Sequence, residues 1–218
     1  MQGYRDRVEA GKAVADLVAR HDYSRPVVLA LPRGGVPVAA EVARVLGAPL
    51  DLVMVRKIGV PSQPELAAAA VVDGARPELV VNDEIARHAG LSRADLDRLA
   101  EGQLEVIRRR RQTYLKDRKH VDLKDRTAIV VDDGIATGAT MRAALKAVRR
   151  QGPARVVLAV PVAAPDSLAA LRGEVDDIIC PTVPAFLGAI GAFYQRFDQT
   201  SDDEVIRLLA AAPPSDEP

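Results

Sequence analysis

Short apolar runs alternate with amphipathic segments along most of this chain. The runs are rich in Val, Ile and Leu and have the length of strands that are buried on both faces of a sheet. They occupy residues 27–31, 50–55, 128–131 and 155–160 and a short stretch near Ile178. Between them, apolar residues recur at helical spacing, as at Val14, Leu17 and Val18 in a helix expected over residues 5–20. The pattern predicts an α/β fold, with a mostly parallel twisted sheet and helices on both faces.

Turn and capping residues mark the ends of further elements. Gly47 closes a helix expected over residues 36–46, and Ser92 with Asp95 forms a capping-box pattern for a long helix that ends near Tyr114. The other expected elements are a hairpin over 66–81 that turns at Asp73 and Gly74, helices over 139–151 and from Pro165, and a last helix capped by Ser201 and Glu204.

Composition sets limits on the architecture and the partners. At 218 residues the chain can form one domain over residues 1–218, with a helical insertion at about 82–115 and a frayed tail at 212–218. Thirty basic and thirty acidic residues give a formal net charge of zero, which argues against a general nucleic-acid or anionic-membrane surface. No apolar run approaches the ~20 residues that span a bilayer, and the first residues lack a secretion signal, so we expect a cytoplasmic protein.

Several reactive or charged residues are expected to have structural roles. Cys180 is the single cysteine, so it can form no intrachain disulfide, and we expect a buried thiol. The arginines at 108–111 follow Glu101 and Glu105 at helical spacing, which predicts a solvated helix face with ion pairs. The three histidines are scattered without metal-ligand spacing and are expected at the surface: His21, His88 and His120.

Two adjacent carboxylates, Asp132 and Asp133, directly follow the strand expected at 128–131. Burying both without partners would cost on the order of several kcal/mol, so we expect the chain to reach the surface there. In open α/β sheets, ligands bind in the crevice beyond the carboxyl ends of the strands. Because each carboxylate can accept hydrogen bonds from hydroxyl groups, the pair suits a vicinal diol.

A turn of small residues follows this acidic pair and opens into a helix. Its backbone N–H groups and those of the first helical turn point outward together, which makes a cup for phosphate. The hydroxyls of Thr137 and Thr140 add donors, and Gly138 and Ala139 leave room for close backbone approach. The residues of the turn are Gly134, Ile135, Ala136, Thr137, Gly138, Ala139 and Thr140. A phosphate beside a diol describes a ribose 5-phosphate.

The run VVDDGIATGAT resembles the 5-phosphoribosyl 1-diphosphate signature of the type I phosphoribosyltransferases. In that family the acidic pair, here Asp132 and Asp133, holds the ribose 2- and 3-hydroxyls, and the following turn, here residues 134–140, binds the 5-phosphate. Over most of residues 1–210 the chain also resembles a group of predicted bacterial phosphoribosyltransferases of unassigned substrate. The resemblance implies the type I fold with a small hood lobe, a homodimer, and Mg²⁺ held without a dedicated set of protein ligands.

A second group, Arg33, Gly34 and Gly35, follows the first expected strand. Two glycines permit close backbone approach, and arginine offers a planar fork of donors for phosphate oxygens. By itself such a segment is typical of an ordinary turn. In the resembled family this position carries the diphosphate-binding loop, which implies that these three residues hold the diphosphate. The resemblance also predicts a cis peptide bond within residues 32–35.

Residues 56–65 are expected to form a mobile loop, because Gly, Ser and two prolines leave little to bury. Similar phosphoribosyltransferases close a loop here over the substrate, so Lys57 is expected to reach the diphosphate, with Arg56 beside it or in a solvated turn. The hypoxanthine-guanine subgroup carries a proton-handling acid where this chain has Ala136, whereas adenine-type enzymes take an acid from the loop. Glu65 is therefore a candidate base, with a surface carboxylate as the alternative.

Aromatic residues gather near the end of the chain. Phe186, Phe193 and Tyr194 lie within residues of about 181–200, which the resemblance makes a candidate hood segment that stacks the acceptor base. The alternative is an anchor to the core, because Phe193 and Phe197 have helical spacing.

The expected activity is transfer of the 5-phosphoribosyl group from 5-phosphoribosyl 1-diphosphate to a nitrogenous base or related nucleophile, with release of diphosphate and assistance from Mg²⁺. The catalytic candidates are Asp132, Asp133, Lys57 and Glu65. A non-catalytic sensor of 5-phosphoribosyl 1-diphosphate is the alternative, and a ribose-phosphate diphosphokinase, which usually needs a longer two-lobed chain, is a third. The sequence leaves the acceptor open.

Overall fold

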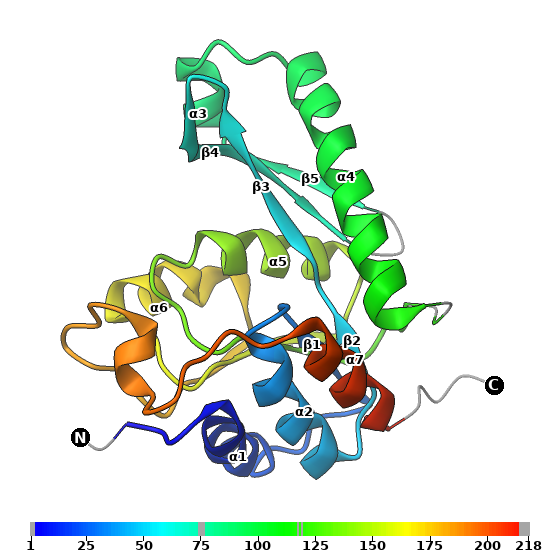
Figure 1. The fold of residues 1–218 in the computed structure, drawn as a ribbon, viewed down its shortest axis with the longest axis vertical. Helices are drawn as coiled ribbons and strands as arrows, with labels where there is room; N and C mark the ends of the chain where they lie inside the picture. The colour runs from blue at the N-terminus through cyan, green and yellow to red at the C-terminus, as the bar shows by residue number, and fades with distance from the viewer. Residues whose placement is uncertain (1–2, 74–76, 117, 119, 214–218) are drawn as a thin grey trace.

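The centre of the molecule is a five-stranded parallel sheet (Figure 1). The structure is a computed structural model that describes residues 3–73, 77–116, 118 and 120–213, and at 64 and 65 it describes the backbone alone. Its strands, in spatial order, are β2 (Leu50–Leu52), β1 (Pro26–Ala30), β6 (Thr127–Val131), β7 (Arg155–Ala159) and β8 (Asp177–Ile179). The register pairs Ala30 with both Leu52 and Val131, and Ala159 with both Val131 and Ile179. The strands therefore end level with one another, so the segments that follow β1 and β6 leave the sheet side by side.

Helices cover both faces of this sheet, as the sequence predicts. Alternate strand residues such as Val28 and Ile129 belong to one apolar core, and Val27 and Ala128 belong to the other. The first core contains buried residues of α1 (Arg7–Val18), α2 (Gly35–Leu46) and α7 (Asp202–Ala211). The second contains those of α5 (Ala139–Arg150) and α6 (Pro165–Leu171), and Figure 1 shows α1 and α2 below the sheet and α5 above it.

A second sheet rises from the main body as a lobe (Figure 1). It consists of the antiparallel strands β3 (Val55–Val60), β4 (Gln63–Val72) and β5 (Glu78–Val81). Two helices, α3 (Asp83–His88) and α4 (Arg93–Leu115), complete the lobe and occupy the expected insertion. The capping box of Ser92 and Asp95 at the start of α4 is confirmed. The β4–β5 hairpin is also confirmed, although its turn at Gly74 lies outside the described residues.

The expectation of a mobile loop over residues 56–65 is wrong. These residues form β3, a two-residue turn and the start of β4. Ile58 and Val60 are 3% and 5% exposed and belong to the core shared with α4. Gly59 lies at an irregularity in the strand pairing, so the residues typical of a loop occupy a bulge and a turn within a hairpin.

Four charged side chains, which we call the charged quartet, join the lobe to the main sheet. Arg111 of α4 lies 3.3 Å from an oxygen of Asp51 and 3.0 Å from an oxygen of Asp73. The ring nitrogens of His120 lie 3.6 Å from each of the same two carboxylates. Although burial opposes its charge, hydrogen bonding to Asp51 and Asp73 raises the pKa of His120. Burial likewise opposes ionisation of Asp51, but His120 and Arg111 hold the pKa of this carboxyl below its usual value.

This quartet corrects two expectations of surface positions. Arg108 and Arg109 pair with Glu105 on the exposed face of α4, as predicted. Arg111 points instead between the two sheets, where its side chain is 13% exposed, and the side chain of His120 is 23% exposed. Helical spacing shows partners within one helix, and it gives no information about carboxylates that arrive from other elements.

The remaining elements follow the expected order. The 3₁₀ turns η1 (Arg172–Glu174) and η2 (Ile190–Phe193) flank β8, and Ser201 caps α7 by accepting a hydrogen bond from the Glu204 N–H. Cys180 is partly buried, and burial raises the pKa of its thiol to about 11. Most of the expected tail lies outside the described residues. Among the helices that the structure describes, none has the length and apolar character needed to cross a membrane.

Candidate functional site

The acidic pair Asp132 and Asp133 lies at the carboxyl end of β6, a strand whose five residues are all buried. The pair is partly buried rather than fully solvated, and a partner that the sequence did not reveal accompanies it. Arg7, in the first turn of α1, donates its Nε–H to Oδ2 of Asp133 at 2.8 Å. The Tyr194 hydroxyl donates to the Asp133 carbonyl oxygen at 2.6 Å, and the Asp133 N–H donates to Oδ1 of Asp132 at 2.9 Å.

The electrostatics of the two carboxyls differ. Burial, together with the neighbouring charge of Asp133, raises the pKa of Asp132 well above its usual range. Burial also raises the pKa of Asp133, but the hydrogen bond and charge of Arg7 oppose that shift. A ligand that donates hydroxyl hydrogen bonds or brings positive charge therefore stabilises the ionised form of Asp132 more than that of Asp133.

The loop after β1 lies directly against this acidic pair. A Cβ atom on Gly34 would overlap Oδ2 of Asp133, and one on Gly35 would come 2.9 Å from Cα of Asp132. Gly34 has φ −60° and ψ −35°, an ordinary helical conformation, so the requirement for glycine is one of space. The Pro32–Arg33 peptide bond is cis, which confirms the expectation for this loop.

Arg33 is held by the C-terminal helix in this structure. Its guanidinium lies 3.3 Å from Oδ1 of Asp202, in the first turn of α7, and the same oxygen accepts a 2.7 Å hydrogen bond from the Tyr114 hydroxyl. The Arg33 side chain remains 28% exposed. An anion placed beside Gly34 would therefore compete with Asp202 for Arg33.

The turn at residues 134–140 is buried at its start and open at its end. Gly134 and Ile135 are buried, and the Ile135 N–H donates to the Val162 carbonyl oxygen at 2.9 Å, so these residues anchor the turn. Gly138 has φ +74°, a conformation that favours glycine. The side chains of Ala136, Thr137 and Ala139 are exposed, and Thr140 is partly exposed.

This turn leads into α5 without a capping side chain. No side-chain hydrogen bond caps Gly138 at the start of the helix. The first N–H groups of an α-helix have no partner within the helix, and they point out of its N-terminal end. This end of α5 is therefore suited to bind a phosphate group.

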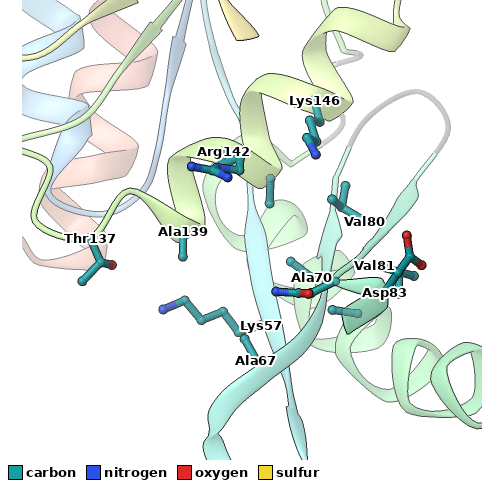
Figure 2. A pocket seen from close by; sticks show the side chains of 13 residues that line it. Lys57, Ala67, Ala70, Val80, Val81, Asp83, Thr137, Ala139, Arg142 and Lys146 are labelled. Atoms are coloured by element: carbon teal, nitrogen blue, oxygen red, sulfur yellow. The ribbon is translucent and has the colours of Figure 1, made fainter. Parts of the chain in front are cut away.

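Lys57 and Arg56, on β3, have different surroundings. The exposed Lys57 lines a cavity with Thr137 and Ala139, which brings it to the side of the turn (Figure 2). Arg56 instead donates its Nε–H to the side-chain oxygen of Gln103 on α4 at 3.0 Å, so it supports the lobe. Glu65 is in β4, and its side chain lies outside the described residues.

The three aromatic candidates also differ in burial and in their contacts. Phe186 is 86% exposed, whereas Phe193 is partly buried and its carbonyl oxygen accepts the Tyr4 N–H at 2.8 Å. Tyr194 is 7% exposed, and its ring contacts those of Tyr4 and Phe197 with centroids 5.8 Å and 4.8 Å away. Burial therefore argues against Tyr194 as a stacking platform for a base and gives it a role in supporting Asp133.

Arg7 and Tyr194 are the neighbours of the acidic pair that sequence reasoning missed or misread. Arg7 lies 126 positions before Asp133, and Tyr194 lies 61 positions after it. No spacing rule connects positions so far apart. The acidic pair itself gave a weak signal for such a partner, because two adjacent carboxylates at the end of a buried strand require a cation or a ligand nearby.

Comparison with known proteins identifies similar chains. A family model described as "Phosphoribosyl transferase domain" matches residues 6–194. In Mycobacterium tuberculosis (strain ATCC 25618 / H37Rv), the protein named "Putative phosphoribosyl transferase Rv0571c" is 46% identical over 213 residues, and the same holds for its counterpart in strain CDC 1551 / Oshkosh. The match covers 97% of this chain and 47% of each relative, so the chain spans about half the length of the curated relatives it matches.

One crystal structure is similar along nearly the whole chain. The protein TT1426 from Thermus thermophilus has a TM-score of 0.84 and 43% sequence identity, over 95% of this chain and 97% of that chain. The shared fold therefore includes the lobe as well as the main sheet.

Proposed function

Because the chain belongs to the phosphoribosyl transferase domain family, we propose that it transfers the 5-phosphoribosyl group from 5-phosphoribosyl 1-diphosphate to a nitrogen nucleophile and releases diphosphate. The observation that carries the proposal is the contact of Gly34 and Gly35 with the acidic pair. It brings a loop suited to diphosphate against carboxylates suited to the ribose hydroxyls, beside a turn suited to the 5-phosphate.

The proposed reaction breaks the bond between C1 of the ribose and diphosphate, and positive charge develops at C1. Asp132 and Asp133 accept hydrogen bonds from the ribose hydroxyls and stabilise this charge. The N–H groups and hydroxyls of Thr137 and Thr140 bind the 5-phosphate, with Gly138 permitting the turn. Ala136 has no group that could transfer a proton, so the base that deprotonates the nucleophile is supplied elsewhere.

Two cations are proposed to stabilise the leaving diphosphate. Arg33 exchanges its contact with Asp202 for phosphate oxygens, and Lys57 approaches from β3 along the side of the turn. Arg56 supports this strand through Gln103. Glu65 remains the candidate base by its position in β4.

Mg²⁺ fits the donor groups present. Among the described residues, no three His, Cys, Asp or Glu side chains are grouped to hold a metal ion. Asp132 would hold the Mg²⁺ ion, because Arg7 pairs with Asp133 instead. When bound, the metal ion neutralises charge on the diphosphate.

The acceptor base is proposed to enter near residues 181–200, where Phe186 is the exposed aromatic side chain. Stacking on Phe186 would need no change in the buried cluster around Tyr194. A Phe186→Ala variant tests this assignment through the KM of the acceptor.

The deciding experiment is to measure diphosphate release from 5-phosphoribosyl 1-diphosphate with Mg²⁺ and a panel of nitrogenous bases. Release that depends on one base, and that is lost in Asp132→Asn, would support the proposal. Tight binding without turnover across the panel would favour a sensor of 5-phosphoribosyl 1-diphosphate instead. Full binding by Asp132→Asn would contradict the site itself.

A further inference from the structure

A cavity of about 390 Å³ lies between α5 and the second sheet (Figure 2). Thr137 and Ala139 are at one end of it, beside the turn 134–140. From there the cavity extends along α5 to Lys146, seven residues after Ala139, or about 10 Å along the helix axis. Most of the cavity therefore lies next to the turn 134–140 and is not part of it.

The lining of the cavity carries excess positive charge. Arg142 and Lys146 come from successive turns of α5, and Lys57 comes from β3 on the opposite side. Asp83 is the one carboxylate among the described lining residues, so three cations face one anion. Lys146 forms a partly exposed ion pair with Glu174 at 3.7 Å, and Arg142 donates an exposed hydrogen bond to the Ala170 carbonyl oxygen at 3.3 Å. Lys57 is exposed. Exposed contacts of this kind contribute little free energy. These cations can therefore turn toward a ligand at little cost.

The wall opposite α5 is apolar and shallow. It is made by Ala67, Ala69 and Ala70 of β4 and by Val80 and Val81 of β5. These small side chains leave room for a flat ring between the strands and the helix. A volume of 390 Å³ is also within the range of about 300–1,000 Å³ that is typical of small-molecule sites.

Polar groups at the far end would orient such a ring. Asn82 uses its side-chain oxygen to accept the Ile85 N–H at 3.3 Å, which directs the amide oxygen to α3 and leaves the amide nitrogen as a donor. The Asp83 carboxylate beside it can accept hydrogen bonds from ring N–H groups. Figure 2 shows Lys57 at the end of the cavity near Thr137 and Asp83 at the other.

From this arrangement we infer a second anion site between α5 and β4, which binds a small flat molecule carrying a carboxylate or phosphate group. The anion lies against Lys146 and Arg142, and the ring lies on the alanine wall of β4. Because the acceptor is proposed to enter near residues 181–200, such a ligand is an effector that is not consumed.

The test uses small aromatic compounds with and without a negative charge. Pyridine-3-carboxylate, pyridine-3-carboxamide and phenyl phosphate are titrated into the ¹⁵N-labelled protein, and amide chemical shifts are followed. We expect the two anions to shift the resonances of Ala70, Val81 and Ala143 and to bind at least about fivefold more tightly than the carboxamide. Equal affinity for carboxylate and carboxamide, or no shift at these residues, would overturn the inference.

Variants locate the anion. Lys146→Gln is expected to weaken phenyl phosphate binding about fivefold and to reduce its salt dependence, because Lys146 is on the cavity wall. Lys12→Gln, an exposed lysine of α1, is the matched control and should leave binding unchanged. Ala67→Leu, which fills the cavity from β4, should weaken binding of all three compounds. Equal effects of Lys146→Gln and Lys12→Gln would contradict the site.

A competition arm separates this site from the proposed function. Saturating 5-phosphoribosyl 1-diphosphate with Mg²⁺ should leave the shifts caused by phenyl phosphate in place, whereas displacement would mean that the anion occupies the turn 134–140. If 5-phosphoribosyl 1-diphosphate does not bind at all, the proposed function fails while the titration of the free protein still tests the cavity. Binding without consumption identifies an effector, whereas consumption of the bound anion with diphosphate release would contradict this assignment.

Discussion

Arg7 donates its Nε–H to Oδ2 of Asp133 at 2.8 Å and so joins the first helix to the acidic pair. The same guanidinium lies 3.9 Å from the centre of the Phe197 ring and donates to the Asp198 carbonyl oxygen at 2.6 Å. The side chains of Arg7 and Asp133 are 12% and 13% exposed. Arg7 therefore balances the charge of one carboxylate while holding the segment after η2 beside the site.

Replacing Arg7 by Gln is expected to lower the free energy of unfolding by about 3 kcal/mol at pH 7, because Asp133 would keep its burial and lose its partner. The pKa of Asp133 should rise further, so 5-phosphoribosyl 1-diphosphate should bind only at higher pH. Urea unfolding and the pH dependence of binding measure the two effects. Arg109→Gln, which removes an exposed pair with Glu105, is the control, and equal losses in both variants would contradict this role.

Asp132→Asn should stabilise the free protein while weakening its activity. A carboxyl whose pKa is raised by folding contributes stability below its unfolded pKa, near 3.8, and that stability is lost as pH rises through the folded pKa. The amide removes this loss, so Asp132→Asn should be more stable at pH 7 by on the order of 1 kcal/mol. The difference should disappear near about pH 3.

In the proposed mechanism Asp132 stabilises the charge at C1, so kcat/KM of the same variant should fall by about 100-fold or more. Thermal unfolding at both pH values and diphosphate release provide the measurements. Asp97→Asn, at an exposed position on α4, should change neither quantity. A variant that is less stable at pH 7 would refute the assigned electrostatics.

Gly34→Ala tests the contact between the two loops. The added Cβ would overlap Oδ2 of Asp133, so the carboxylate must move and its bond to Arg7 must lengthen. We expect binding of 5-phosphoribosyl 1-diphosphate to weaken by about 100-fold, since a small displacement in a site has effects of this size. Calorimetric titration measures the affinity.

Gly102→Ala is the matched control for that substitution. Gly102 is inside α4, and nothing lies within 4 Å of its added Cβ. This variant should bind normally and unfold with about 0.5–1 kcal/mol more free energy, because alanine favours helix. Normal binding by Gly34→Ala would mean that the loop does not contribute to the site.

Arg111→Gln is expected to destabilise the protein by about 3–5 kcal/mol, because it leaves Asp51 and Asp73 buried with one partner fewer. The two carboxylates are 4% and 7% exposed, so water cannot replace the guanidinium without rearrangement. Arg108→Gln, on the exposed side of the same helix, should change stability by less than about 0.5 kcal/mol. Urea unfolding distinguishes the two outcomes.

His120 should make stability depend on pH. Its pKa is raised on folding, so its contribution is complete below the ordinary value of 6.5 and is lost as pH rises through the folded pKa. The difference in free energy of unfolding between wild type and His120→Gln should therefore shrink as pH rises above the ordinary value of 6.5. His88→Gln, at an exposed residue of α3, serves as control. Parallel curves for wild type and His120→Gln would exclude the charged form of His120 from the quartet.

Local patterns were sufficient for most elements of the fold. Apolar runs such as 128–131 predicted strands, and the capping residues Ser92 and Asp95 predicted the start of α4. These signals depend only on residues that are close to one another in the sequence. The sequence did not predict the hairpin of β3 and β4, because Gly59 and the prolines are typical of a loop and the alternation of apolar residues beside them is short. Packing against α4 decides the conformation of this segment.

By itself, the sequence determined a parallel sheet and the presence of two carboxylates and a small-residue turn at one strand end. Only the tertiary structure decided that Gly34 lies against Asp133, that Arg7 balances its charge, and that Arg111 and His120 are shared between two carboxylates. Such contacts join side chains from separate elements, and their free energies depend on burial and distance. Both quantities exist only after the strands have aligned and the helices have packed.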